Sequence, residues 1–306
     1  MRRLLITGSS GLLGLNLALH SQELGWEARG WHNQHPLNGA PFQSRAVNMA
    51  ETAKLPALLE AERPDLLINC AAVANIDQAE KNPALAWTLN AEVPGILAET
   101  TKRLGIPFIH ISTDAVFDGL KGDYRETDAP NPINHYAENK LAGEKAVLSA
   151  NEAAIVARVV FFGWSLSGQR SLAEFFYNNL IAGKTMMGFT DMIFTPLYVR
   201  HLADLLLEMA QKELSGLYHV FGNQALSKYT FGVSLAREFG LDESLVSPHL
   251  TEDLPQPAAR SLNLEMNIGK LEAALGHPLP GVTEGLAALK SDLDNGWRER
   301  ILAMGR

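Results

Sequence analysis

The 306-residue chain carries 34 acidic and 26 basic residues, so its formal net charge is −8. A nucleic-acid partner would require a basic face, which this balance argues against. The single cysteine excludes an internal disulfide and leaves no basis for a zinc cluster. No apolar run reaches the roughly 18 residues of a membrane span, and the N-terminal apolar stretch is too short for a signal peptide. We therefore expect a cytoplasmic protein without membrane association.

Short apolar runs alternate with longer helical patterns through the first half of the chain. Helical patterns cover residues 12–24, residues 84–104 and a stretch from about residue 134, with a kink expected at Pro94 and Gly95. Runs typical of buried strands cover residues 3–7, 27–31, 66–71, 107–112 and 154–162. This alternation predicts an α/β fold with a doubly wound parallel sheet of the Rossmann type over residues 1–162.

The pattern is less regular after residue 163. We expect a smaller substrate-binding lobe over residues 163–306, interleaved with later sheet elements near residues 190–222. Its expected helices cover residues 172–182, 199–212, 227–239 and 282–295. Short strands are expected near residues 217–221 and 246–250, and a surface loop over residues 251–257.

A glycine-rich turn lies between the first predicted strand and the first predicted helix. Glycine at positions 8, 11 and 14 lets the backbone turn tightly and approach a pyrophosphate without a Cβ in the way. The helix N-terminus then offers free N–H groups to the phosphates. An ordinary strand–helix turn is the alternative, but the position favours a dinucleotide site. The expected cofactor contacts from this turn are Gly8, Ser10, Gly11, Leu12, Leu13 and Gly14.

The cofactor preference depends on the end of the second predicted strand. An acidic side chain there would bind the ribose 2′-hydroxyl and exclude a 2′-phosphate. Residues 29–35 contain no carboxylate, which favours NADPH and leaves NADH as the alternative. Arg29, His32 and Asn33 are candidate contacts, although Arg29 is equally well explained as a surface residue of the strand.

Tyr136 and Lys140 are four residues apart in a predicted helix and therefore share one face. A neighbouring ammonium lowers the pKa of a phenol, which is otherwise about 10. Tyr136 would exchange a proton with a carbonyl oxygen during hydride transfer, and Lys140 would also hold the ribose. Thr113 would hydrogen-bond the same oxygen, and Asp114 would orient a sugar hydroxyl. A tyrosine packed against the sheet is the alternative, but the glycine turn upstream favours catalysis.

Two other reactive side chains are interpreted as structural. His110 lies in an apolar predicted strand and is expected to be a hydrogen-bonded core residue rather than a catalyst. Cys70 is expected to be a small buried residue at the end of a strand.

Together these motifs resemble the dTDP-4-dehydrorhamnose reductase family of extended short-chain dehydrogenase/reductases. The resemblance spans nearly the whole chain and rests on residues 8–14, 69–72, 77–80, 90, 112–119 and 136–144. It implies NAD(P)H-dependent reduction of the 4-keto group of a nucleotide-linked deoxy sugar. It also implies that Ala71 and Ala72 lie near the nicotinamide ribose, and that Asn48 and Met49 lie near the adenine.

The resemblance implies two further substrate contacts. Phe161 stands where the family often has a tryptophan against the sugar, and core packing is an equal alternative for it. Arg260 stands at a C-terminal motif position where it would bind a diphosphate, and a surface salt bridge is the equal alternative.

Some positions depart from the related patterns. Dehydratases that resemble this fold carry a glutamate after the aspartate, whereas here Ala115 follows Asp114, so reduction is favoured over water elimination. Val73, Met192 and Leu197 replace residues that are commonly polar in the reductases. These losses leave a rival open, a non-catalytic NADP-binding regulatory subunit that resembles the methionine adenosyltransferase β-subunit. A homodimer is expected only by default.

Overall fold

The computed structural model describes residues 2–253 and 259–305. Its main sheet has seven strands, all parallel, in the order β11-β6-β5-β4-β1-β2-β3. The strands are β1 (Arg3–Thr7), β2 (Glu27–His32), β3 (Gln43–Ala46), β4 (Leu66–Asn69), β5 (Phe108–Thr113), β6 (Ile155–Val159) and β11 (Gly216–His219). The predicted doubly wound sheet is confirmed. The edge strand β3 was not predicted, because its four residues are mostly exposed and form no apolar run.

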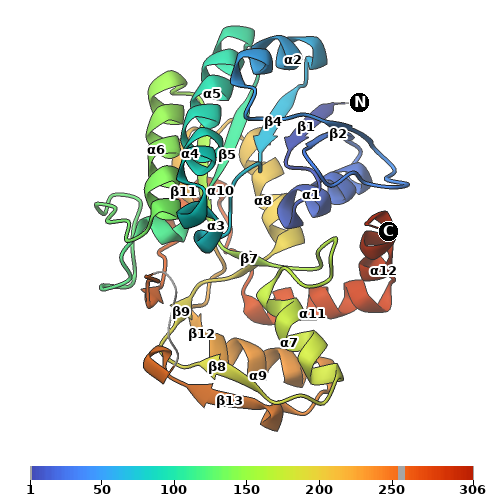
Figure 1. Cartoon of the computed structure of the whole chain (residues 1–306), viewed down its shortest axis with the longest axis vertical. Helices are drawn as coiled ribbons and strands as arrows, with labels where there is room; N and C mark the ends of the chain where they lie inside the picture. Colours follow the sequence, from blue (N-terminus) through green and yellow to red (C-terminus); the bar gives the residue numbers. More distant parts are fainter. Residues whose placement is uncertain (1, 254–258, 306) are drawn as a thin grey trace.

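Helices cover both faces of this sheet (Figure 1). One face carries α2 (Leu55–Glu62), α5 (Val93–Leu104) and α6 (His135–Ala150), and the other carries α1 (Leu12–Glu23) and α8 (Val199–Gln211). Side chains alternate between two apolar cores, with Leu4 and Ile6 in one and Leu5 in the other. Near-continuous apolar strands are therefore required here, since both faces are buried. Among the described helices, none combines the length and apolarity needed to cross a membrane.

The predicted long helix of residues 84–104 is interrupted. After α3 (Ile76–Lys81), α4 (Pro83–Trp87) passes into a π-helical segment, Thr88–Glu92, before α5 begins. The break therefore precedes Pro94, which sits in the first turn of α5 where proline is tolerated. Asn90, inside the π segment, bonds both the N–H (2.9 Å) and the carbonyl (3.1 Å) of Val73. The irregular turn thus anchors the loop that follows β4.

The rest of the chain forms the lower lobe in Figure 1 and additional cover for the sheet. Its helices are α7 (Leu172–Ile181), α9 (Lys228–Phe239), α10 (Gly269–Leu275), α11 (Val282–Asp294) and α12 (Trp297–Met304). Its strand pairs are β7 (Phe161–Phe162) with β10 (Leu197–Tyr198), and β8 (Met186–Phe189) with β13 (Val246–His249). A third sheet orders β12 (Leu226–Ser227), β9 (Ile193–Phe194) and β14 (Asn263–Leu264). Most of these strands are too short to leave a sequence signal.

Two further expectations from the sequence concern this half of the chain. The strand near residues 217–221 is β11, which joins the main sheet beside β6 rather than the lobe. The loop of residues 251–257 begins with a 3-10 turn, Thr251–Asp253, and its remaining residues lie outside the described ones.

Candidate active site

A cavity of about 610 Å³ opens where β1, β2, β4 and β5 end. Ligands of open α/β sheets bind at this carboxyl edge. Most of the residues expected from the sequence line it. They are Gly8, Ser10, Gly11, Leu12, Leu13, Gly14, Met49, Ala71, Ala72, Thr113, Tyr136, Lys140 and Phe161.

The glycine turn forms one wall of the cavity and cannot carry side chains. Gly8 has a φ of +66°, and a Cβ there would lie 2.9 Å from the backbone of Ala71. A Cβ on Gly14 would lie 2.3 Å from the carbonyl oxygen of Gly8. Helix α1 begins after Gly11 without a side-chain cap and without an acidic residue in its first turn. Its first N–H groups therefore face the cavity unsatisfied by side chains, which suits a phosphate.

Two expected cofactor contacts do not line the cavity. The His32 side chain is buried, and its Nδ1 lies 2.6 Å from Ser44 Oγ on the neighbouring strand β3. Burial lowers the pKa of His32, so its ring is neutral near pH 7. Asn48 is exposed and directs its Nδ2 to Glu51 at 3.3 Å.

The polar side chain that lines the cavity at the end of β2 is an amide rather than a charged group. Arg29, one candidate for a 2′-phosphate contact, is paired with Glu27 at 2.6 Å and with Glu62 at 3.3 Å. Asn33, another candidate, lines the cavity together with Trp31. Of the three contacts considered from the sequence, Asn33 is therefore the one in position.

Thr113 and Tyr136 meet at the end of β5. Asn134 caps α6 by accepting a hydrogen bond from Ala137 N at 2.9 Å, which fixes the first turn that carries Tyr136. Burial raises the pKa of Tyr136 to about 12, aided by the nearby Asp114 and opposed by a hydrogen bond with Thr113. Tyr136 is therefore protonated at neutral pH and is suited to donate a proton.

Lys140 lines the cavity and is held by two residues of β5. Its Nζ donates to the carbonyl oxygen of Ile111 at 2.6 Å and lies 3.4 Å from His110 Nε2. Burial lowers the pKa of Lys140 to about 8, opposed by Glu144. Desolvation dominates the pKa of Tyr136 here, and the lowering expected from Lys140 together with the nicotinamide ring stays a prediction.

Asp114 opens a 3-10 turn, Asp114–Val116, directly behind Thr113. Its carboxyl group is buried and accepts a hydrogen bond from Thr113 Oγ1 at 3.1 Å. Burial raises the pKa of Asp114 to about 6, whereas Lys228 acts to lower it. Lys228 begins α9 and has its own pKa lowered to about 8, first by burial and then by Arg260. No sequence signal had marked Lys228.

Arg260 and Arg170 come from the C-terminal lobe. Arg260 does not line the cavity but lies 3.8 Å from Asp77 Oδ2, and its buried Nε has no hydrogen-bond partner among the residues that the structure describes. Arg170, just before α7, lines the cavity with an exposed side chain. A lone arginine in a loop leaves no pattern in the sequence, so Arg170 was missed.

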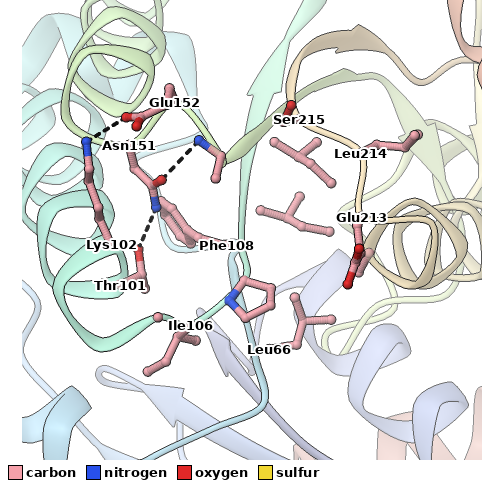
Figure 2. Close-up of a pocket in the computed structure, with 16 residues that line it drawn as sticks. Leu66, Thr101, Lys102, Ile106, Phe108, Asn151, Glu152, Glu213, Leu214 and Ser215 are labelled. Carbon is pink, nitrogen blue, oxygen red and sulfur yellow. Dashed lines mark hydrogen bonds and ion pairs between the residues drawn. The ribbon is translucent and has the colours of Figure 1, made fainter.

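A second cavity, of about 440 Å³, lies at the opposite edge of the sheet, near Leu66 and Phe108 (Figure 2). Lys102 and Glu152 form an ion pair of 2.6 Å on its rim. Asn151 donates to Thr101 at 3.3 Å. These polar groups satisfy one another, and the glycine turn is on the far edge, so this cavity is not the candidate site.

The parallel sheet, the uncapped glycine turn and the Thr113–Tyr136–Lys140 cluster define a Rossmann-type α/β protein with a candidate hydride-transfer site. The sequence matches the RmlD substrate binding domain family over residues 1–294, and the chain belongs to that family. This confirms the resemblance found in the sequence.

Three known proteins illustrate the range of the family. A probable low-salt glycan biosynthesis reductase, Agl14 of Haloferax volcanii, is 35% identical over 94% of this chain and 96% of its own. Methionine adenosyltransferase 2 subunit beta of Xenopus tropicalis is 31% identical over 98% of this chain and 91% of its own. A dTDP-4-dehydrorhamnose reductase of Bacillus anthracis, solved in complex with NADP, has a TM-score of 0.85 at 25% identity, covering 95% of this chain and 100% of that one.

Proposed function

We propose that this protein is an NADPH-dependent reductase of the 4-keto group of a nucleotide-linked deoxy sugar, such as dTDP-4-dehydrorhamnose. The observation that supports this most directly is that Thr113, Tyr136 and Lys140 line the same cavity as the uncapped glycine turn. Such a pairing joins a dinucleotide site to a proton donor. The solved reductase of Bacillus anthracis, similar in fold, binds NADP.

The residues present fit a dinucleotide. Gly8 and Gly14 leave a cradle that a Cβ would fill, and the N-terminus of α1 offers N–H groups to the pyrophosphate. We assign Ala71, Ala72 and Lys140 to the nicotinamide ribose, and Met49 to the adenine. His32 and Asn48 stay in this proposal only as neighbours of the adenine end, since neither lines the cavity. When bound, the reduced nicotinamide supplies the hydride.

The side chains supply the proton and the orientation. Tyr136 Oη donates its proton to the carbonyl oxygen as that oxygen gains negative charge. Thr113 Oγ1, which donates to Asp114 in the structure, turns its hydroxyl to the same oxygen and thereby places the carbonyl. Lys140, when charged, stabilises the phenolate left on Tyr136. The protonated resting state of Tyr136 suits reduction rather than oxidation.

The preference for NADPH over NADH rests on the end of β2. Asn33, and no carboxylate, reaches the cavity there among the described residues, so nothing charged opposes a 2′-phosphate. Measured dissociation constants for the two cofactors test this directly. A tighter complex with NADH would overturn the preference.

The sugar nucleotide is assigned to the C-terminal side of the cavity. Phe161 lines it and offers an apolar face to the sugar. Asp114 and Arg260 do not line the cavity themselves. We assign Asp114 to a sugar hydroxyl, and Arg260, whose buried Nε is unpartnered among the described residues, to the diphosphate. Both side chains influence the pKa of Lys228, so the three groups are electrostatically coupled.

The test is NADPH oxidation with dTDP-4-dehydrorhamnose, comparing the wild type with Tyr136→Phe. We expect turnover to fall about 10²- to 10⁴-fold, while cofactor affinity changes little, because only the proton donor is lost. The matched control is Tyr177→Phe in α7, which keeps an aromatic ring packed against Trp164 and should stay active. Equal activity of Tyr136→Phe and the wild type would exclude Tyr136 as the donor.

A second candidate, a cofactor-binding regulatory subunit, is favoured by the similarity to methionine adenosyltransferase 2 subunit beta. It predicts tight NADPH binding without turnover of any keto sugar, and a stoichiometric complex with a methionine adenosyltransferase catalytic subunit. Turnover that depends on Tyr136 would reject it.

A further inference from the structure

A row of buried polar side chains crosses the sheet beneath the cavity. Thr7, Asn69 and His110 occupy the same register position on the neighbouring strands β1, β4 and β5. Thr7 Oγ1 lies 2.5 Å from Asn69 Oδ1, Asn69 Nδ2 lies 3.0 Å from His110 Nδ1, and His110 Nε2 lies 3.4 Å from Lys140 Nζ. The first three side chains are fully buried and Lys140 is 2% exposed. Solvent therefore cannot substitute for any partner in the row.

The ring of His110 limits how this row can be hydrogen-bonded. Desolvation lowers the pKa of His110 well below its ordinary value, and Lys140 adds to the effect, so the ring is neutral. A neutral imidazole has one donor nitrogen and one acceptor nitrogen. His110 must therefore donate at one end of the row and accept at the other.

Two arrangements give both ring nitrogens of His110 a hydrogen-bond partner. If Lys140 is an ammonium, it donates to Nε2, so Nδ1 of His110 carries the proton and donates to the Asn69 carbonyl oxygen. If Lys140 is a neutral amine, it accepts from Nε2–H, and Asn69 then donates to Nδ1 while Thr7 donates to Asn69. The positions of the Asn69 amide atoms match the second arrangement, but a rotation of that amide gives the first.

We propose that His110, held by Asn69 and Thr7, is the positioning residue of Lys140, and that the hydrogen bonds of this row reverse direction when Lys140 gains or loses a proton. The row ends under the cofactor loop, because Ala71 N–H donates to Thr7 Oγ1 at 3.2 Å. The charge of Lys140 is thereby coupled to side chains on three strands.

The surroundings of Lys140 place both arrangements within reach. Its pKa is lowered to about 8 by burial, while Glu144 acts to raise it. Glu144 is itself paired with Arg158 at 2.7 Å, and Cys70 stays a neutral thiol because burial raises its pKa to about 12. Tyr136 is also neutral near pH 8. Lys140 is therefore the group whose titration reverses the row in this range.

The first test is spectroscopic and does not depend on the proposed function. Long-range proton–nitrogen spectra of histidine-labelled protein distinguish the two neutral tautomers, and His110→Gln assigns the signal. We expect His110 to stay neutral and to exchange its Nδ1–H tautomer for the Nε2–H tautomer as the pH rises through about 8. His219 is an internal control, because it is equally buried but lies between the carbonyl of Asn267 and the guanidinium of Arg158, which allow only the Nδ1–H form.

Lys140→Met should abolish the exchange at His110 and leave His219 unchanged. A single His110 tautomer across the whole range in the wild type would overturn the proposal, as would a step that persists in Lys140→Met. The wild-type spectra test the tautomer exchange of His110 on their own, even if Lys140→Met is poorly folded.

The second test is kinetic, and it rests on the proposed reductase activity. The amide of the glutamine in His110→Gln can still donate or accept a hydrogen bond, whereas the leucine in His110→Leu can do neither. We expect His110→Leu to lower kcat about 10- to 100-fold and to shift the basic limb of the pH profile, with His110→Gln much closer to the wild type. Equal losses in both variants with unshifted profiles would reduce His110 to a packing residue. Absence of turnover in the wild type would reject the proposed function, while the spectra would still decide the proposal.

Discussion

The main sheet and the C-terminal lobe hold their polar side chains in different ways. Thr113 ends a six-residue central strand, and Lys140 is bonded to the backbone of that same strand. By contrast, Arg170 lies before α7, and Lys228 follows the two-residue strand β12. Rigid elements give precise geometry, while loops allow variation. This difference agrees with the proposed function, in which the sheet edge performs the proton chemistry and the lobe selects the substrate.

The largest effect should come from adding a side chain to the glycine turn that lines the cofactor cavity. In Gly14→Ala the new Cβ would lie 2.3 Å from the Gly8 carbonyl oxygen, so the turn must move. We expect NADPH affinity, measured by fluorescence titration, to fall about 100-fold, which is about 3 kcal/mol. Gly269→Ala is the control in the lobe, because its nearest neighbour is a side-chain atom at 3.3 Å. Comparable losses of NADPH affinity in both variants would show that the glycine turn is no more sensitive to an added methyl group than the lobe.

A pH-dependent effect should follow from Asp114. Its folded-state pKa is about 6 against an ordinary 3.8, so between these values the unfolded chain releases its proton first. Stability therefore falls as the pH rises through this window, and the penalty is complete above about pH 6. Two pKa units correspond to about 3 kcal/mol.

Asp114→Asn removes this penalty. Its free energy of unfolding in urea, relative to the wild type, should rise between about pH 4 and pH 6.5. Asp294→Asn, at the exposed end of α11, is the control. Parallel stability curves for Asp114→Asn and the wild type would show that the carboxyl group is not strongly desolvated.

The sequence was most informative for residues at or directly after the ends of predicted strands. The turn at Gly8, Gly11 and Gly14 and the strand end at Thr113 lie where the sequence placed them, because apolar strands and their termini leave a pattern. His110 was rightly expected in the core. Its contact with Lys140 was not foreseen, because the register that aligns Thr7, Asn69 and His110 arises only when distant strands pair.

The lobe was less predictable. Strands of two residues, such as β9 and β12, show no periodicity, and they position Lys228 from far along the chain. Met192 and Leu197, interpreted from the sequence as lost polar contacts, are buried apolar residues in this structure. Their apolar character is therefore explained by packing, without reference to the substrate.

A smaller effect should distinguish substrate selection from catalysis. Lys228→Met removes a half-buried cation near Asp114, so we expect the KM for the sugar nucleotide to rise about tenfold, or about 1.4 kcal/mol, with kcat and NADPH affinity nearly unchanged. Lys184→Met, at an exposed position of the same lobe, should change neither constant. A fall in kcat at constant KM would instead place Lys228 with the catalytic side chains.

The smallest effect should come from Arg170, which brings a positive charge from the lobe to the wall of the cofactor cavity. Its side chain is exposed, so water and salt screen its attraction for phosphate groups. We expect Arg170→Ala to weaken NADPH binding about threefold at low ionic strength, or about 0.7 kcal/mol, and much less at high salt. Arg170→Lys should retain most of the affinity. A salt-independent loss larger than that of Gly14→Ala would mean that the lobe, rather than the sheet edge, holds the cofactor.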